Sequence, residues 1–286
     1  MGQERIRKNL EITVALDQSG DRPKSIITNQ YTCYPLRLST AFRLDKDDPQ
    51  RAYLYMTNTS PGILAGDHWR FQMKLEAGTS LHITDQSATK VHAMPIEGTK
   101  AKISSDIQIN QGASLEFIPE PLILFAESSL EQNTRIQLHP EADLFWSEII
   151  LPGRIARGEY YDFNYCFNRV EIRSDDNKLL FRDAMHLEGK DNLFQQNPLF
   201  SSKTVMANFI IIQPQLDLEI LGKKLEDLEA AHCPDLVMSS SVLPYEKGLL
   251  VRALADKTLE LKKYLHYALN CVRTLGDHPR LPYIAK

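Results

Sequence analysis

The sequence predicts a mainly β protein, built as a β-helical or solenoid array of stacked hairpins and strands with two short helical segments near the C-terminus. Three stretches, residues 73–83, 107–117 and 136–146, align without a gap and share one phrase: apolar, polar, apolar, a turn, then apolar, polar, apolar. Alternation with a period of two places the apolar side chains on one face of a strand. Because a single hairpin cannot bury that face, we expect the copies to stack around one core, as a solenoid or a layered sandwich.

The turns and the spacing of the phrases support this stacking. Gly78 and Gly112 stand at the turns of the first two phrases, where a tight turn favours a residue that tolerates left-handed backbone. Leu81, Leu115 and Leu144 occupy equivalent positions and recur after 34 and 29 residues. That interval is the scale of one layer in a stacked β array.

Strands are expected to dominate as far as about residue 215. We expect one domain over residues 1–286, with residues 5–215 mainly β and residues 216–286 holding helices and late strands. Besides the three phrases, the pattern predicts strands over Ile6–Leu16, Tyr34–Leu38, Arg51–Thr57, Tyr160–Arg173, Lys178–His186 and Leu249–Leu254. Asp175-Asp176-Asn177 is the expected turn between two of these strands.

Helix signals appear only near the C-terminus. Leucines spaced by three and four residues predict a helix over Asp217–Ala231, which Pro234 ends. Asp256 is a candidate cap for a second helix that reaches Leu275 and ends at Gly276. Both helices carry an apolar stripe of the kind that faces a core, so we expect them to cover an open edge or end of the β array.

Composition and charge argue against several functional classes. The 286 residues are 43% hydrophobic, and a net charge of −4 does not provide the basic face of a nucleic-acid-binding protein. The four cysteines contain no Cys-x-x-Cys pair, which predicts neither a structural zinc site nor a disulfide framework. The sequence has no signal-peptide core and no apolar run long enough to cross a membrane, so we expect a reduced, cytoplasmic protein.

Polar and glycine-rich clusters gather between Asn58 and Glu159. They are a turn-rich connection at residues 58–67, a mostly polar stretch at 84–92, and a segment at 148–159 with two carboxylates and two guanidinium groups. Each has a plain structural explanation, namely a turn, a solvated loop, and surface ion pairs worth about 0 to 1 kcal/mol each. Taken one at a time, the clusters define no function.

Taken together, the order and spacing of the motifs resemble the urease accessory protein family UreD, also called UreH. The resemblance rests on Gly62–Asp67, Ser87–Val91, Ser114–Ile123, Gly153-Arg154 with Gly158-Glu159, and Gly248–Leu254, and it covers roughly residues 5 to 275. Two features depart from the family pattern. Pro61-Gly62 and Ala65-Gly66 stand where the family has paired glycines, and the ending Arg280–Lys286 differs from the usual one.

The resemblance implies a non-enzymatic metallochaperone scaffold that is required for nickel insertion into urease. Family members resemble right-handed β-helical scaffolds with short terminal helices. The resemblance also implies binding to UreF, to the GTPase UreG through UreF, and to the urease apoprotein subunits. Ni²⁺ would pass transiently through an internal tunnel, and no cofactor would be tightly bound.

Five carboxylates lie in or beside the matching motifs and are the candidate residues of a transient nickel path: Asp67, Asp85, Glu116, Glu148 and Glu159. Scattered single carboxylates suit an ion that must be released again, and nickel accepts carboxylate ligands. Strand alternation lets Glu116 and Glu148 point opposite their apolar neighbours. We expect Asp67, Glu148 and Glu159 to face inward along one path, although each carboxylate can equally be structural.

Other polar residues are expected to support this path or to take no part in it. Thr89, Lys90, Arg154 and Arg157 are candidates for structural support and charge balance. The eight histidines show no His-x-His or His-Glu-x-x-His arrangement, which argues against a preformed catalytic metal site. The adjacent pair His232-Cys233 precedes a proline and is expected to end a helix.

Two alternatives from other functional classes remain open. A carbohydrate-active hydrolase on a β-helix would use Glu148 and Glu159 as acid and base, with their carboxyl groups about 5 to 9.5 Å apart. Against it, Trp69 and Trp146 are the only tryptophans available to stack on a sugar. The other alternative is an interaction scaffold that binds no metal. Equilibrium dialysis with Ni²⁺ separates a metal carrier from a scaffold, and a glycan hydrolysis screen detects a hydrolase.

Overall fold

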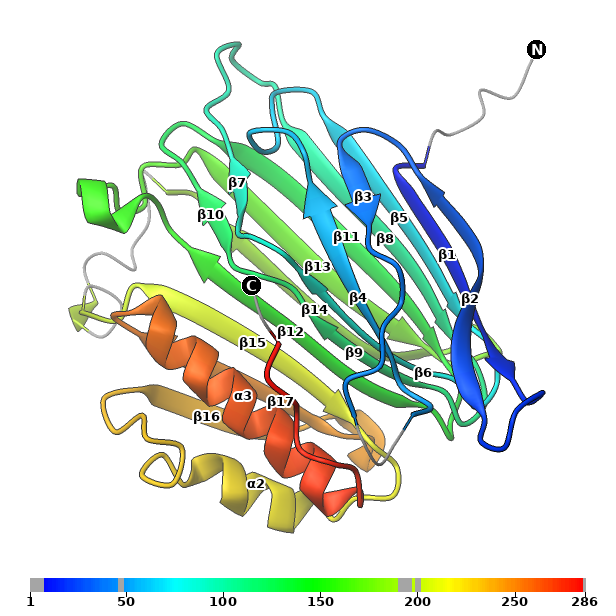
Figure 1. Ribbon diagram of the computed structural model, residues 1–286. Coiled ribbons are helices and arrows are strands. Elements are labelled where there is room, and N and C mark those ends of the chain that lie inside the picture. The colour runs from blue at the N-terminus through cyan, green and yellow to red at the C-terminus, as the bar shows by residue number, and fades with distance from the viewer. Residues whose placement is uncertain (1–7, 46–48, 190–196, 199–201, 285–286) are drawn as a thin grey trace.

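The computed structural model describes residues 8–45, 49–189, 197–198 and 202–284. In this part of the chain, two β-sheets pack face to face and two α-helices lie on one side of them (Figure 1). Sheet A contains β1 (Leu10–Asp17), β2 (Lys24–Thr32), β5 (His68–Leu75), β8 (Ala101–Ile109), β11 (Ser129–Leu138), β13 (Tyr165–Arg173) and β14 (Leu179–Leu187). Its strand order is β14-β13-β11-β8-β5-β1-β2.

Sheet B is the larger sheet. It contains β3 (Leu36–Leu38), β4 (Ala52–Asn58), β6 (Ser80–Asp85), β7 (Thr89–Val91), β9 (Ser114–Ile118), β10 (Leu122–Leu124), β12 (Asp143–Leu151), β15 (Val205–Ile212), β16 (Val237–Val242) and β17 (Leu249–Ala255). Its main strand order is β16-β17-β15-β12-β9-β6-β4-β3, and β10 joins β7 to β12. Two short 3₁₀ turns complete the described elements, at Ile155–Arg157 and Pro244–Glu246.

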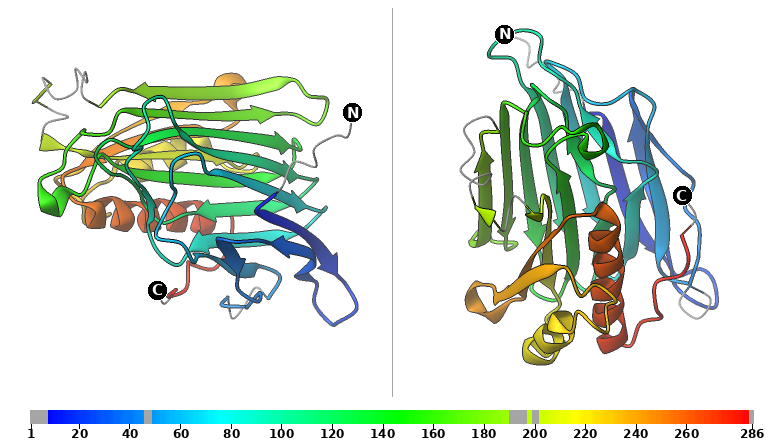
Figure 2. Two further views of the ribbon diagram at one scale, coloured as in Figure 1. Left: turned by 90° about the horizontal axis from the view of Figure 1, so that it is seen from above. Right: turned by 90° about the vertical axis from the view of Figure 1, so that its left-hand side faces the viewer.

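The three repeated phrases form the centre of both sheets, as stacked arches and not as hairpins. The first strand of each phrase lies in sheet A and the second lies in sheet B, so each turn crosses between the sheets (Figure 2). Equivalent strands pair in parallel, and Leu81, Leu115 and Leu144 are register partners, as the gap-free alignment requires. The predicted hairpin pairing is wrong because alternation shows which side chains are buried without showing which strand supplies the hydrogen bonds.

The mainly β class is confirmed, whereas a β-helical solenoid is not. The strands that flank the arches pair in antiparallel fashion, as in β1 with β2, β13 with β14, β12 with β15, and β15 with β17. Both sheets are therefore mixed, and the architecture is a layered sandwich. The main core fills the space between the sheets, where Leu81, Leu115 and Leu144 have no exposed surface.

Most of the predicted strands exist with shifted ends. β1 begins at Leu10, while Ile6 lies outside the described residues. β13 begins at Tyr165, five residues later than predicted, because a loop with a 3₁₀ turn precedes it. β2, β7, β10, β15 and β16 were not predicted. In β15 nearly every residue is buried, since the inner face meets one core and the outer face another, so the strand shows no alternation.

The two helices are α2 (Leu218–Glu226) and α3 (Thr258–Leu275). Asp217 caps α2, because its Oδ1 accepts the backbone N–H groups of Glu219 and Ile220 at 2.9 and 3.0 Å. The prediction that this helix reaches Ala231 is wrong: Asp227 accepts the N–H of Ala230 and turns the chain after Glu226. The predicted cap Asp256 is also wrong, since Lys257 holds that position.

The helices cover the outer face of sheet B, where an edge or end of the array was predicted. The apolar stripe of α3 packs on β12, β15 and β17 and forms a second core with α2 (Figure 1). Leu261, Leu265 and Leu269 of the predicted stripe are all buried in this core. The stripe meets a face because β15 presents buried apolar side chains on that side.

A buried cluster of charged side chains anchors the C-terminal end of α3 to sheet B. Arg273 donates two hydrogen bonds to Glu116, at 2.8 and 2.6 Å, and Arg51 Nη1 lies 3.0 Å from Glu116 Oε1. Arg273 also donates to Asp45 at 3.4 Å, to Tyr53 at 3.1 Å and to the carbonyl of Pro279 at 3.3 Å. The forked guanidinium pairs with both carboxylate oxygens at once, which makes this contact directional as well as strong. The cluster therefore fixes where α3 lies on the sheet.

We predict that Arg273→Met lowers the free energy of unfolding by about 3–5 kcal/mol, because it leaves Glu116 buried without its main partner. Urea denaturation at neutral pH measures this loss. Lys223→Met is the control, since Lys223 forms an exposed pair with Glu219 on α2 and is expected to cost about 0–1 kcal/mol. The double variant Glu116→Gln/Arg273→Met should recover part of the loss. A cost below that of the control would contradict the anchoring role.

Candidate functional site

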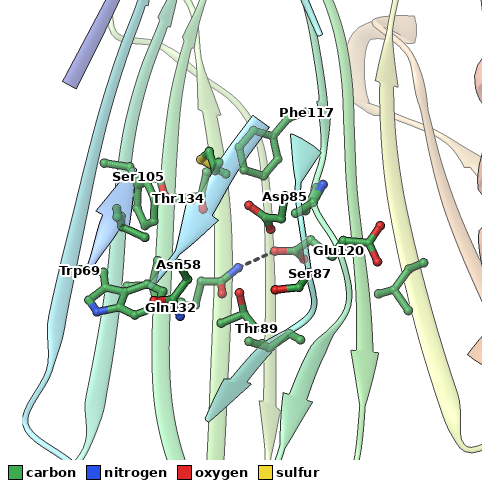
Figure 3. Close-up of a pocket in the computed structure, with 18 of the residues that line it drawn as sticks. Asn58, Trp69, Asp85, Ser87, Thr89, Ser105, Phe117, Glu120, Gln132 and Thr134 are labelled. Atoms are coloured by element: carbon green, nitrogen blue, oxygen red, sulfur yellow. Dashed lines mark hydrogen bonds between the residues drawn. The ribbon is translucent and has the colours of Figure 1, made fainter. Parts of the chain in front are cut away.

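A cavity of about 100 Å³ lies between the two sheets (Figure 3). The ends of β4, β6 and β9 line it on one side, and the first halves of β5, β8 and β11 line it on the other. Its apolar lining includes Trp69, Phe117 and Trp146, with the last two rings stacked at 4.1 Å. Its polar lining consists of Asn58, Asp85, Ser87, Thr89, Ser105, Glu120, Gln132, Thr134 and Glu148.

The polar side chains enter the interior because they occupy inward positions of the strands. In β11, Gln132 and Thr134 alternate in the same series as Ile136, which belongs to the main core. Ser105 is the register partner of Thr134 on the neighbouring strand β8. Parallel stacking thus aligns polar residues of successive arches beside one another.

Glu148 is the central ionisable group of the cavity. Its carboxylate accepts hydrogen bonds from Gln132 Nε2 at 2.6 Å and from Asn168 Nδ2 at 2.7 Å (Figure 3 marks the first). Gln132 and Asn168 are register partners on adjacent strands of sheet A, so they hold the carboxylate from across the sandwich. Burial raises the pKa of Glu148 to about 7, although both amides favour its ionised form.

Unpaired polar atoms beside Glu148 show that the cavity suits water. Thr134 Oγ1 and Asn168 Oδ1 are buried and have no hydrogen-bond partner among the described residues. A cavity of about 100 Å³ with polar walls has room for several water molecules that can satisfy these atoms. The interior around Glu148 is therefore suited to hydrated ligands.

The cavity opens to solvent where Ser87 lines it, because Ser87 is exposed. We call this opening the mouth and define it by Asp85, Ser87, Thr89 and Glu120, which Figure 3 shows close to one another. The mouth combines two carboxylates with two hydroxyl groups. Lys262 of α3 lies beside it, with its Nζ 2.7 Å from Glu120 Oε2.

The structure brings three of the predicted site residues together. Asp85, Thr89 and Glu148 all line the cavity. Glu116 lies elsewhere, because it points from β9 toward α3 on the opposite face of sheet B, into the cluster of Arg51 and Arg273. Burial alone would raise the pKa of Glu116, but the two guanidinium groups hold it well below its usual range. His82 donates to the same carboxylate, with its Nδ1 2.7 Å from Oε2 and its own pKa lowered by burial.

Asp67 and Glu159 do not line the cavity, so Asp67, Glu148 and Glu159 do not face inward along one path as expected. Asp67 Oδ2 accepts the backbone N–H of Leu64 at 2.8 Å and closes a turn. Glu159 Oε2 accepts from Arg154 Nε at 2.8 Å, and this pairing lowers the pKa of Glu159. Both carboxylates stabilise loops between strands.

The predicted supporting residues have similar local roles. The carbonyl of Lys90 accepts the N–H of Ile63, while the side chain of Lys90 is exposed. Arg154 lies over the ring of Phe125 at 4.5 Å in addition to pairing with Glu159. Arg157 is exposed on the 3₁₀ turn. Gly62 and Gly153 are needed for close packing, because a Cβ would collide with the carbonyl of Lys90 or of Glu159.

The hydrolase alternative has no support. Glu148 lies inside the cavity, whereas Glu159 pairs with Arg154 in a loop, so the two carboxylates do not share a site. Trp69 and Trp146 are both buried and present no exposed ring to a sugar.

Several residues of the cavity and one of the buried cluster escaped prediction, and each group had a signal in the sequence. Gln132, Thr134 and Ser105 are polar residues in the inward series of strands whose other inward residues are apolar, which marks a polar spot inside a core. Arg273 follows Leu269 by four residues and so falls on the apolar face of α3. An arginine at such a position needs a buried partner.

Among the described residues, no three or more histidine, cysteine, aspartate or glutamate side chains come together in a way that could hold a metal ion. Within the same residues, none of the helices has the length and apolar character needed to cross a membrane.

Comparison with known proteins places these features in a family. Residues 9–286 match the family described as UreD urease accessory protein. A urease accessory protein UreD from Trichodesmium erythraeum is 57% identical over 278 residues, which cover 97% of this chain and 99% of the relative. UreD from Photorhabdus laumondii is 30% identical over 90% of this chain and 79% of its own length. UreH from Helicobacter acinonychis is 30% identical over 76% of this chain and 80% of its own length.

The raised pKa of Glu148 predicts a specific pH dependence of stability. The folded state holds this proton up to a pH of about 7, against an ordinary value of 4.5, so wild-type stability falls as the pH rises through that window. Glu148→Gln keeps the shape and removes the charge. From pH 5 to pH 8 the variant should therefore gain about 2–3 kcal/mol relative to wild type in urea denaturation. The exposed control Glu141→Gln should show no such change. A constant difference for Glu148→Gln would mean that Glu148 titrates normally.

Proposed function

The chain belongs to the UreD family of urease accessory proteins, and we propose that it carries Ni²⁺ toward apo-urease through the cavity between its sheets, with Glu148 as the central carboxylate. Urease accessory proteins support the maturation of urease, and nickel insertion is the step of that maturation to which a metal-binding interior contributes. The observation that carries the proposal is Glu148 itself, a buried carboxylate held by two amides beside unpaired polar atoms.

The chemistry of the cavity suits a metal ion in transit. A divalent ion keeps part of its water shell when the surrounding oxygen ligands are few, so it stays mobile. Glu148 with neighbouring amide and hydroxyl groups supplies such a weak set, and nickel accepts carboxylate ligands. Because the pKa of Glu148 is about 7, the carboxylate can exchange a proton for the cation near neutral pH. A closed cage of several charged ligands would instead retain the ion.

A row of polar side chains leads from Glu148 to the far edge of the sandwich. Glu148, Asn208 and Arg252 are register partners across β12, β15 and β17, and directly opposed residues share one face of a sheet. Arg252 Nη2 lies 2.7 Å from Asp183 Oδ1 of sheet A, and the charge of Asp183 contributes to the raised pKa of Glu148. We infer that the path enters at the mouth and continues along this row.

The proposed path differs from the five carboxylates expected from the sequence. It retains Asp85 and Glu148, with Thr89 at the mouth, and adds Glu120 and Asp183. Asp67, Glu116 and Glu159 have structural partners of their own and lie outside it. Nickel is the cargo of this path, and no tightly bound cofactor is proposed.

We further propose that the protein acts without catalysis, in the cytoplasm, in a complex with UreF, with UreG through UreF, and with the urease apoprotein. Family membership supports contact with urease and with other accessory proteins. A scaffold that positions these partners without touching nickel is the competing account. The buried carboxylate favours the metal carrier, since a scaffold has no need of an ionisable group that destabilises its interior at neutral pH.

The test is co-expression of wild-type or variant chain with its urease and the other accessory proteins at limiting nickel. Glu148→Gln is expected to reduce nickel per urease active site to a fraction of the wild-type value, because the path loses one carboxylate ligand. The yield of the accessory complex should be unchanged. The matched control Glu141→Gln alters an exposed turn and should load nickel normally. Normal loading by Glu148→Gln would favour the scaffold, and so would a loss fully explained by a lower complex yield.

A further inference from the structure

We propose that Lys262 of α3 is a tethered cation that closes the mouth of the cavity by pairing with Glu120, and that an entering metal ion displaces it. This inference rests on the proposed function. It assigns a role in cargo entry to a helix residue outside every motif that identified the family.

The contact joins parts of the chain that are far apart in sequence. Lys262 Nζ lies 2.7 Å from Glu120 Oε2, across 142 residues. The Glu120 side chain is 8% exposed and lines the cavity, whereas the Lys262 side chain is 37% exposed. The ammonium group therefore reaches the mouth from the solvent side, which is the side from which a cation would enter.

The position of Lys262 is fixed by the rest of α3. Lys262 and Arg273 are separated by three helical turns, so they lie on nearly the same face of the helix, about 16 Å apart along its axis. Arg273 pairs with Glu116 and Lys262 pairs with Glu120, two acidic residues of one short segment. The buried cluster at Arg273 holds the helix in place and thereby keeps Lys262 at the mouth.

The two contacts differ in how easily they open. Arg273 is 1% exposed and binds both oxygens of Glu116, so its release would break a two-point contact between buried charges. Lys262 uses one compact ammonium group against one oxygen, and its side chain is half-exposed, so solvent screens this contact more than the buried contact of Arg273. Release of Lys262 therefore costs less than release of Arg273, because the ammonium group can move into solvent.

A divalent cation can replace the ammonium group at this place. Asp85 and Glu120 supply carboxylates at the mouth, and Ser87 and Thr89 supply hydroxyl oxygens. A doubly charged ion gains more from these oxygens than a single ammonium does, because the Coulomb attraction scales with charge. Exchange at Glu120 therefore admits the metal ion and moves Lys262 outward in one step. The ion replaces the ammonium group as the partner of Glu120, and no covalent bond changes.

The experiment compares the initial rate of urease nickel loading, at limiting Ni²⁺, for complexes that contain wild type, Lys262→Met, Lys262→Arg or Lys263→Met. Removal of the tethered charge in Lys262→Met is expected to raise the rate about two- to fivefold, which corresponds to the loss of one weak, partly screened ion pair. Lys262→Arg keeps a cation and should restore a rate near wild type. Lys263→Met removes an exposed lysine next in sequence and should have no effect. Adding Glu120→Gln to Lys262→Met should abolish the gain.

Glu148→Gln in the same experiment separates failure of this inference from failure of the proposed function. If Glu148→Gln slows loading while Lys262→Met equals wild type or loads more slowly, the path is used and the role of Lys262 is wrong. If neither variant changes the rate, both the path and the role of Lys262 are wrong. A gain that persists in Lys262→Met/Glu120→Gln would overturn the pairing with Glu120 as its cause.

Discussion

The structure depends on the parallel register of three stacked arches. Each arch sends one strand to each sheet, so the register that aligns Leu81, Leu115 and Leu144 in sheet B also aligns Ser105 with Thr134 in sheet A. A slip of one residue would turn every inward side chain outward. The same constraint that builds the apolar core therefore gathers polar residues at one place inside it, and Glu148 finds its amide partners there.

Alternation in the sequence was sufficient to predict the strands of the three copies and the alignment of those copies, because burial of one face restricts which residue types occur there. It did not reveal that the arms of each phrase lie in different sheets, since hairpins and arches bury the same positions. Nor did it distinguish Glu116 from Glu148. Both alternate with apolar neighbours, but Glu116 lies on the face covered by α3 and Glu148 on the face toward sheet A. That difference is set by packing between distant elements.

The two faces of sheet B give their carboxylates opposite electrostatic character. Two guanidinium groups keep Glu116 ionised and make it an anchor for α3. The hydrogen-bond donors to Glu148 are neutral groups, so burial dominates its pKa and leaves it able to gain or lose a proton near neutrality. A structural carboxylate and a carboxylate suited to transient cation binding thus occur on adjacent strands of sheet B, on its two opposite faces.

The central claim is that the space around Glu148 admits a divalent cation. Anomalous X-ray scattering at the nickel absorption edge, from crystals of the accessory complex soaked in Ni²⁺, tests it most directly. The account predicts an anomalous peak between the sheets beside the Glu148 carboxylate, and its disappearance in Glu148→Gln. Peaks confined to surface histidines, with nothing inside the sandwich, would contradict it.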